Sequence, residues 1–371
     1  MKKLLLLVFS VISLFATDFN DTEKEFSLIN PQETQNILGN TIITGNTVAC
    51  ISEFNESNPS TSIEKLQNSP CSNNLNHNTN KYFVKYIDVD NNGSTFNSST
   101  ATLQFPNTYK KIKWAGLFWQ GNLNNISKLY KKFNGEYVEN NDSSLSNEQN
   151  FDTFNEMKNK GKMIVLMKIG TNSYKKVEAP KVSYSEWDFK AIYGAYANVT
   201  DYLKEQNITG GEVNVTIANI PTSRGLETGL GNFDAWVLVV VYEEDSQNPN
   251  SKYRNNSIYF GYKKIYKSES IIKINDLFLP KFGDVESKVA IFAGEGEYPY
   301  KPDELSLYNG QNYIKFGSDS NCSDGNYPSC KNNVFDAKLS PTIKRFPFLK
   351  NNNGIDIVSG QILNDDRAEK K

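Results

Sequence analysis

Histidine is almost absent from this chain, which has a single one, His77, among 371 residues. A Ser-His-Asp or Cys-His catalytic arrangement would have to use that residue. Its neighbours in the stretch NNLNHNTN are polar and supply no apolar shell to orient an imidazole. The sequence therefore argues against hydrolysis of that type, and we expect the chain not to be an enzyme.

An excess of charge is missing too, since 40 lysines and arginines face 42 aspartates and glutamates and the formal net charge is −2. Nucleic-acid binding needs a basic patch or stripe, whereas the lysines here occur mostly as pairs between apolar segments. We therefore expect no nucleic-acid partner. Beyond the N-terminus no run approaches the ~18 apolar residues of a membrane-spanning helix, so we expect no transmembrane segment in the mature chain.

The one long apolar run is N-terminal and reads MKKLLLLVFSVISLFA. Lys2 and Lys3 precede an apolar stretch from Leu4 to Phe15, and Ala16 is a small residue at a cleavage position, as in secretory signal peptides. No cysteine follows directly, so a lipoprotein anchor is not expected. Residues 1–16 predict export, with the protein secreted or at the cell surface of a Gram-negative bacterium and the periplasm as the alternative.

Cysteine is scarce, with four residues in the chain, and this even number fits disulfides in an exported protein. Of the three possible connectivities, two local bridges are the simplest: Cys50–Cys71 and Cys322–Cys330. Zinc is the competing interpretation, but no C-x₂-C spacing occurs and only one histidine is available. We expect two disulfides.

What the sequence does contain is a series of short segments rich in aromatic and β-branched residues, separated by turn residues. They include KYFVKYIDV, TATLQF, MIVLMKI, VNVTIANI, AWVLVVVYEE, NSIYFGYKKI and SKVAIFAGE. This pattern predicts an all-β fold, a large jelly-roll-like β-sandwich with at most one or two short helices. One helix is expected at NVTDYLKEQN, capped by Thr200 or Asp201. We place a polar N-terminal segment at 17–80, the sandwich at 81–371 and a polar insertion at 122–160.

The segment IKWAGLFW, residues 112–119, is apolar on both faces if it is a strand. Simple alternation puts Ile112, Trp114, Gly116 and Phe118 on one face and Ala115, Leu117 and Trp119 on the other. The same holds for AWVLVVV at 235–241. Such strands are central and covered on both sides. Core packing is the main interpretation of these aromatics, and carbohydrate stacking by Trp119 is the alternative.

Several motifs occur in a fixed order: IDVDNNGSTFNSSTATLQFP, IKWAGLFWQG, YANVTDYL, FDAWVLVVVYEEDSQNPNSKYRNNSIYFGYK and VAIFAGEGEYPYKPDELSLYNG. Over roughly residues 81–360 the chain resembles an uncharacterised family of bacterial secreted and cell-surface proteins. The resemblance implies a large β-sandwich with an adhesin-like role, and it supplies no catalytic residues. After NNNGIDIV this chain ends on SGQILNDDRAEKK, where such relatives continue with β sequence, so the resemblance implies a shortened C-terminus.

The stretch DVDNNG has the D-x-D-x-N-G opening of a calcium loop, with candidate ligands Asp88, Asp90 and Asn92. Position 12 of such a loop would be Ser99, where an EF-hand needs a bidentate glutamate. The motif is therefore half of a calcium site at best. The alternative is a turn held by Asx side chains, and we expect no other cofactor.

Asparagine-linked glycosylation is indicated by eleven Asn-x-Ser/Thr sites. They are Asn20, Asn55, Asn92, Asn97, Asn125, Asn141, Asn198, Asn207, Asn214, Asn255 and Asn321. Seven carry an acidic residue two positions earlier, far more than 42 acids in 371 residues would place there by chance. This extended pattern resembles the acceptor of bacterial periplasmic oligosaccharyltransferases. We take Asn20, Asn55, Asn92, Asn141, Asn207 and Asn321 as candidates, whereas Asn214 lies inside an expected strand.

These features together favour a non-enzymatic cell-surface protein with an adhesive or envelope-structural role. We expect its partner to be a surface or host ligand, with a glycan as one candidate, bound through loops such as 122–160. The alternative is a carbohydrate-active protein, a lectin-like module or a glycoside hydrolase. That alternative would use exposed aromatics and a pair of carboxylates, with these candidates: Trp187, Tyr298, Glu295, Glu297, Glu243 and Glu244.

Overall fold

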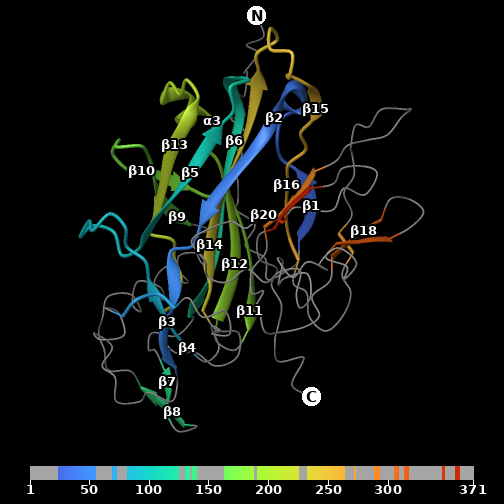
Figure 1. The fold of residues 1–371 in the computed structure, drawn as a ribbon. Coiled ribbons are helices and arrows are strands. Elements are labelled where there is room, and N and C mark those ends of the chain that lie inside the picture. Colours follow the sequence, from blue (N-terminus) through green and yellow to red (C-terminus); the bar gives the residue numbers. More distant parts are fainter. Residues whose placement is uncertain are drawn as a thin grey trace, which may run out of the picture.

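A computed structural model describes the chain over these residues: 24–55, 69–72, 82–124, 130–133, 136–139, 163–187, 190–224, 232–263, 271–272, 288–292, 305–308, 313–316, 345–346 and 356–359. The described part is all-β, with the short helix α3 (Thr200–Glu205) and the 3₁₀ turn η1 (Gln32–Thr34) (Figure 1). This confirms the predicted fold class. Within these residues no helix is long and apolar enough to cross a membrane.

Two larger antiparallel sheets form the body of the molecule (Figure 1). The six-stranded sheet is curled and has the order β11 (Lys181–Trp187), β12 (Lys190–Asn198), β6 (Tyr109–Asn124), β14 (Asp234–Glu244), β2 (Asn36–Asn46) and β15 (Tyr253–Asn255). The four-stranded sheet has the order β10 (Lys175–Glu178), β9 (Ile164–Ile169), β13 (Gly211–Ala218) and β5 (Ser98–Phe105).

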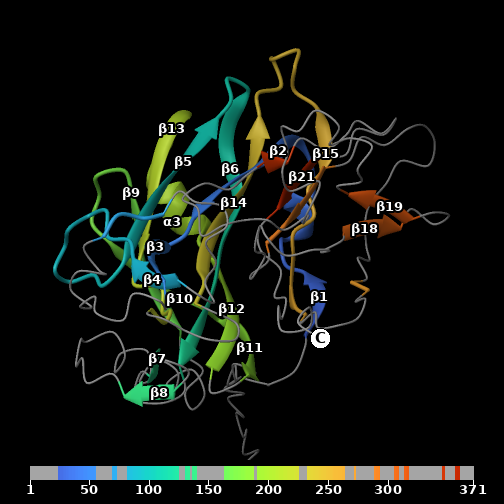
Figure 2. The same cartoon turned by 60° about the horizontal axis from the view of Figure 1, so that its bottom comes forward.

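Smaller sheets surround this body (Figure 2). Four are two-stranded antiparallel pairs: β1 (Lys24–Leu28) with β16 (Tyr259–Tyr262), β3 (Ala49–Asn55) with β4 (Tyr82–Tyr86), β7 (Tyr130–Phe133) with β8 (Glu136–Glu139), and β18 (Leu305–Tyr308) with β19 (Tyr313–Phe316). The last combines β17 (Lys288–Ile291), β21 (Asp356–Ser359) and β20 (Arg345–Phe346), and its β17–β21 pair is parallel.

The main core lies between the two larger sheets. From the six-stranded sheet, Trp119 and Trp236 are directly opposite each other in register, and both are fully buried. From the four-stranded sheet, Val165, Met167 and Val215 pack into the same cluster. A fully buried aromatic or aliphatic side chain stabilises the fold by roughly 1.5–3 kcal/mol relative to exposure. These facing surfaces therefore hold the sandwich together.

The outer face of the six-stranded sheet is covered as well. Trp114, Phe118 and Tyr196 form a second buried cluster there, and Phe260 of β16 packs against it. The strand β6 runs between β12 and β14. The prediction that IKWAGLFW is a central strand covered on both sides is confirmed.

One detail of that prediction is wrong. Ile112 packs with Trp119 in the main core rather than with Trp114 on the outer face. The pairing of β6 with β14 shifts between Trp114 and Ile112, so Lys113 is an extra residue opposite β14. A bulge of this kind interrupts the alternation of side chains. Strict period-two counting fails at that point.

The sandwich begins earlier than residue 81, because β1, β2 and β3 lie within residues 24–55. The strand β2 pairs with β14 over eight residues despite its polar sequence NILGNTIITGN. The polar side chains of β2 have a structural role: Thr44 and Asn46 donate hydrogen bonds to the carbonyls of Thr102 and Thr100, at 2.9 and 2.8 Å. Because β5 is an edge strand, these bonds close the corner where the two sheets meet.

A disulfide fixes the β3–β4 pair to the segment 69–72. Cys50 and Cys71 are bonded, with their Cα atoms 5.7 Å apart, and the amide of Ser72 donates to the carbonyl of Ile51 at 2.7 Å. The predicted Cys50–Cys71 bridge is confirmed and is consistent with an extracytoplasmic location. Cys322 and Cys330 lie outside the described residues.

Candidate functional site

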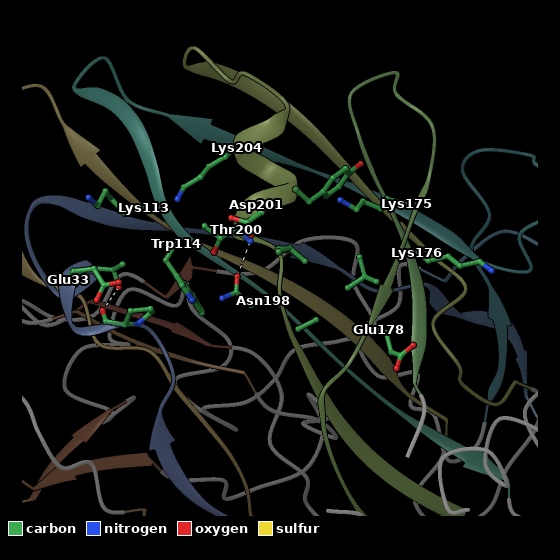
Figure 3. A pocket seen from close by; sticks show the side chains of 16 residues that line it. Glu33, Lys113, Trp114, Lys175, Lys176, Glu178, Asn198, Thr200, Asp201 and Lys204 are labelled. Atoms are coloured by element: carbon green, nitrogen blue, oxygen red, sulfur yellow. Dashed lines mark hydrogen bonds between the residues drawn. The ribbon is translucent and has the colours of Figure 1, made fainter. Parts of the chain in front are cut away.

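A polar groove lies beside α3, where several elements of the body converge. We call it the α3 groove; its volume is about 620 Å³ (Figure 3). It is bordered by η1, the start of β6, β10 and the end of β12 together with α3. The charged side chains among its lining residues are Glu33, Lys113, Lys175, Lys176, Glu178, Asp201 and Lys204.

The helix α3 is held firmly against β6. The amide of Ala115 donates to Oγ1 of Thr200 at 2.9 Å, and the amide of Val199 donates to the carbonyl of Ala115 at 2.9 Å. On its inner side Leu203 is fully buried, and the Tyr202 hydroxyl donates to the carbonyl of Met167 at 3.3 Å. One wall of the α3 groove is therefore part of the packed core.

The helix was predicted, but the predicted cap is wrong. Neither Thr200 nor Asp201 is the N-cap; both lie in the first turn, and the N-cap is Val199, which makes no side-chain capping bond. Instead Oδ1 of Asn198 accepts the amide proton of Thr200 at 3.0 Å. The hydroxyl of Thr200 is used to join α3 to β6, which the local sequence could not indicate.

The lysines of the α3 groove lie on two sides of the helix. Figure 3 shows Lys113 and Lys204 on one side of α3 and Lys175 on the other. The ammonium of Lys175 lies 3.4 Å from Glu205 and 4.7 Å from the centre of the Tyr202 ring. Lys113 lies 3.7 Å from Glu243. Lysine ammonium groups supply several rotatable donors, so the arrangement suits a ligand with many oxygen atoms.

The floor of the groove includes Trp114, which is only 1% exposed. Its ring stacks on Tyr196, with the ring centres 6.3 Å apart. Within the described part of the chain its indole nitrogen has no hydrogen-bond partner. An unpaired buried donor costs roughly 1–3 kcal/mol. The desolvation cost of the Trp114 indole N–H beside the groove is therefore not offset by a hydrogen bond from the described residues.

The predicted calcium loop is a tightly bonded turn. Oδ1 of Asp90 accepts from the amide of Asn92 at 3.1 Å and from Oγ1 of Thr95 at 3.0 Å, and its other oxygen accepts from the Tyr174 hydroxyl. Oδ1 of Asp88 accepts from Oγ of Ser98 at 2.8 Å. These carboxylate oxygens thus already have donors.

The electrostatics of that turn follow from the same contacts. Burial alone would raise the pKa of Asp90, but hydrogen bonds, first of all from Tyr174, hold that pKa at about 2. Burial and the neighbouring Asp90 raise the pKa of Asp88. Nowhere in the described residues are three or more histidine, cysteine or acidic side chains grouped for a metal ion. The geometry favours the Asx turn, and calcium binding stays an untested prediction.

The carboxylates Glu243 and Glu244 have structural partners. Glu243 lies within 3.7 Å of three lysines, Lys110, Lys111 and Lys113. Glu244 is 3% exposed, and one of its oxygens accepts from Arg254 at 3.1 Å and from the amide of Lys252 at 2.9 Å. Both groups neutralise charge at the end of β14.

Asp234 is a buried acid that sequence reasoning missed. It is 0% exposed, and its Oδ1 accepts from the amides of Val48 and Ala49 at 2.6 and 3.2 Å. Its Oδ2 has no hydrogen-bond partner among the described residues. Burial raises the pKa of Asp234 to about 7, although the two amides act in the opposite direction. The only sequence signal is an aspartate at the head of the apolar run FDAWVLVVV.

Several predicted site residues lie outside the described part: Asn20, Asn141, Glu295, Glu297, Tyr298 and Asn321, as does His77, for which no catalytic role was expected. Trp187 ends β11, Asn55 ends β3, and Asn214 lies inside β13 as expected. Of the insertion 122–160, the structure describes the end of β6 and the pair β7–β8. Asn92 and Asn207 are both exposed.

Comparison with known proteins yields no match: no family model, curated protein or solved structure matches this chain.

Proposed function

We propose that this chain is an exported, non-enzymatic protein of the bacterial cell surface with an adhesive or envelope-structural role. The observation that carries the proposal is the α3 groove, a lysine-bordered hollow set on the packed core of an all-β body. The signal-peptide pattern at 1–16 and the Cys50–Cys71 disulfide support export. The resemblance to secreted adhesin-like proteins is in keeping with this role.

The ligand class follows from the chemistry of the groove. Lys113 of β6 and Lys175 of β10 lie on two sides of α3, which itself carries Lys204. Ammonium groups favour carboxylate, sulfate or phosphate oxygens, and acidic side chains between them can accept hydrogen bonds from hydroxyls. An acidic polysaccharide presents both kinds of group. We therefore propose that the α3 groove binds an acidic glycan, in place of the insertion 122–160 favoured by the sequence.

The glycoside-hydrolase form of the carbohydrate-active alternative receives less support. It calls for exposed aromatic platforms, yet Trp119, the stacking candidate whose burial the structure describes, is 0% exposed. A glycosidase also needs two carboxylates across a cleft. Glu243 and Glu244 are instead bound to cations and backbone amides at a strand end.

The proposal is tested by titrating the purified protein with an acidic polysaccharide such as polygalacturonate, with calorimetry as the readout. Replacing Lys113 and Lys204 with Met is expected to weaken binding at least tenfold, because a hydrogen bond to a charged group contributes about 1.5–3 kcal/mol. A matched control replaces Lys110 and Lys252, which do not line the groove, and should leave affinity within about twofold. Equal loss in both variants, or release of reducing ends from the polysaccharide, would contradict the proposal.

A further inference from the structure

The fold reduces the number of sequence-predicted glycosylation sites that an enzyme could modify in the folded protein. An oligosaccharyltransferase that reads the extended pattern must contact three side chains: the acceptor asparagine, the hydroxyl residue two positions later and the acid two positions earlier. All three must therefore protrude from the folded protein. Three sites with the acidic extension have all these side chains within the described part: Asn92, Asn207 and Asn214.

The site at Asn207 presents all three groups. Glu205, Asn207 and Thr209 are exposed, and the Glu205 side chain stays 63% exposed although it lies 3.4 Å from Lys175. The intervening residues Gln206 and Ile208 are half-buried, and Ile208 packs against the main core. The alternation of exposed and half-buried positions anchors the segment through the residues that an enzyme would not read.

The backbone presents Asn207 at the end of α3. It has a φ of 51°, a left-handed conformation that asparagine tolerates better than most residues. Gly210 and Gly211 follow with φ values of 121° and 72°, so the chain turns sharply away from the helix. Among the described residues, the side-chain amide of Asn207 donates only to the nearby carbonyl of Glu205, at 3.3 Å. Little local bonding is lost if that amide is withdrawn.

The other two sites each fail at one position. At Asn92 the acid is Asp90, which is bound to the hydroxyls of Tyr174 and Thr95. At Asn214 the hydroxyl residue is Thr216, which is 4% exposed and shares a 2.8 Å hydrogen bond with Thr100.

Two sites without the acidic extension are also inaccessible to an enzyme in the folded protein. Asn97 is 0% exposed, and its amide group is bonded to the backbone of Ile220. The hydroxyl residue of the Asn198 site is Thr200, whose Oγ1 is bonded to β6.

We propose that Asn207 is an N-glycosylation site of the folded, exported protein. The donor is an oligosaccharide linked to a lipid through a pyrophosphate. The Asn207 amide nitrogen forms a bond to the anomeric carbon of the first sugar, the bond from that carbon to the pyrophosphate oxygen breaks, and the amide nitrogen loses one proton to a base of the enzyme. The lipid pyrophosphate is the leaving group. This inference requires export but does not depend on ligand binding in the α3 groove.

The test uses the purified full chain in its oxidised, folded state, with a bacterial oligosaccharyltransferase of acidic-sequon specificity and its lipid-linked donor. Glycopeptide mass spectrometry then gives the occupancy of each site. We expect Asn207 to be occupied at least tenfold more than Asn92, Asn97 or Asn214. Glu205→Gln should lower occupancy at Asn207 at least tenfold, and Thr209→Ser should retain it.

Two controls keep the result interpretable. Asn207→Gly removes the acceptor and suits the positive φ, so its melting temperature should stay close to that of the parent while the glycan is lost. A short peptide with the same acceptor pattern confirms that the enzyme is active. Equal or higher occupancy at Asn97 or Asn214, or no modification of Asn207 while the peptide is modified, would overturn the proposal.

Discussion

Raising the pH from about 5 to about 8 is expected to lower the free energy of unfolding by roughly 2.5 kcal/mol through Asp234 alone. The folded-state pKa of this carboxyl is raised from 3.8 to about 7, so the folded chain keeps a proton that the unfolded chain has released. Stability is therefore greatest at the acidic end of this range and falls as the pH rises through the folded-state pKa. Urea unfolding at a series of pH values measures the effect.

Asp234→Asn separates this carboxyl from other titrating groups. The amide keeps an oxygen for the Val48 and Ala49 amides and cannot ionise, so the variant should lose most of the pH dependence and be more stable than the parent at about pH 8. The exposed Asp201 on α3 offers the control, and Asp201→Asn should retain the parent's pH dependence. The explanation fails if the Asp234→Asn and parent profiles are parallel.

Trp236→Ala is expected to destabilise the protein by about 3–5 kcal/mol. The ring is fully buried at the centre of the main core, opposite Trp119, and its Nε1 donates to Oγ of Ser99 at 2.8 Å. That bond joins the six-stranded sheet to the four-stranded sheet through β14 and β5. Removal of the side chain creates a cavity and leaves the Ser99 hydroxyl without this donor.

Two further variants separate packing from hydrogen bonding. Trp236→Phe keeps much of the ring and should cost about 1–3 kcal/mol, because mainly the bond to Ser99 is lost. Tyr253, which is 79% exposed on β15, is the surface control, and Tyr253→Ala should change stability by at most about 0.5 kcal/mol. A Trp236→Ala variant with the parent's stability would show that this tryptophan is not part of a packed core.

The sequence could predict those features of the fold that depend on the residues of a single strand. The two-faced apolar pattern of β6 and β14 needs a covered sheet on both sides, and both faces are covered. The strand β2 was missed because its polar residues serve the edge of β5, which is distant in sequence. Ile112 was assigned to the wrong face because a one-residue bulge leaves no mark in composition.

The candidate site was less accessible to sequence reasoning for a related reason. Lys113 and Lys175 are distant in the chain from Lys204 of α3, and the packing of the strands against that helix brings them together. The local pattern DVDNNG suggested calcium ligands, but one of them, the carboxylate of Asp90, accepts a hydrogen bond from the hydroxyl of Tyr174, a residue distant in sequence. Local motifs name candidate groups, whereas their partners are set by tertiary structure.

The measurement that tests export most directly is peptide mass spectrometry, without reduction, of the protein isolated from its native host. Our account predicts a mature N-terminus just after Ala16 and a linked peptide pair containing Cys50 and Cys71. Detection of the uncleaved N-terminus together with reduced thiols at both cysteines would place the protein in a reducing compartment and would contradict the proposed surface role.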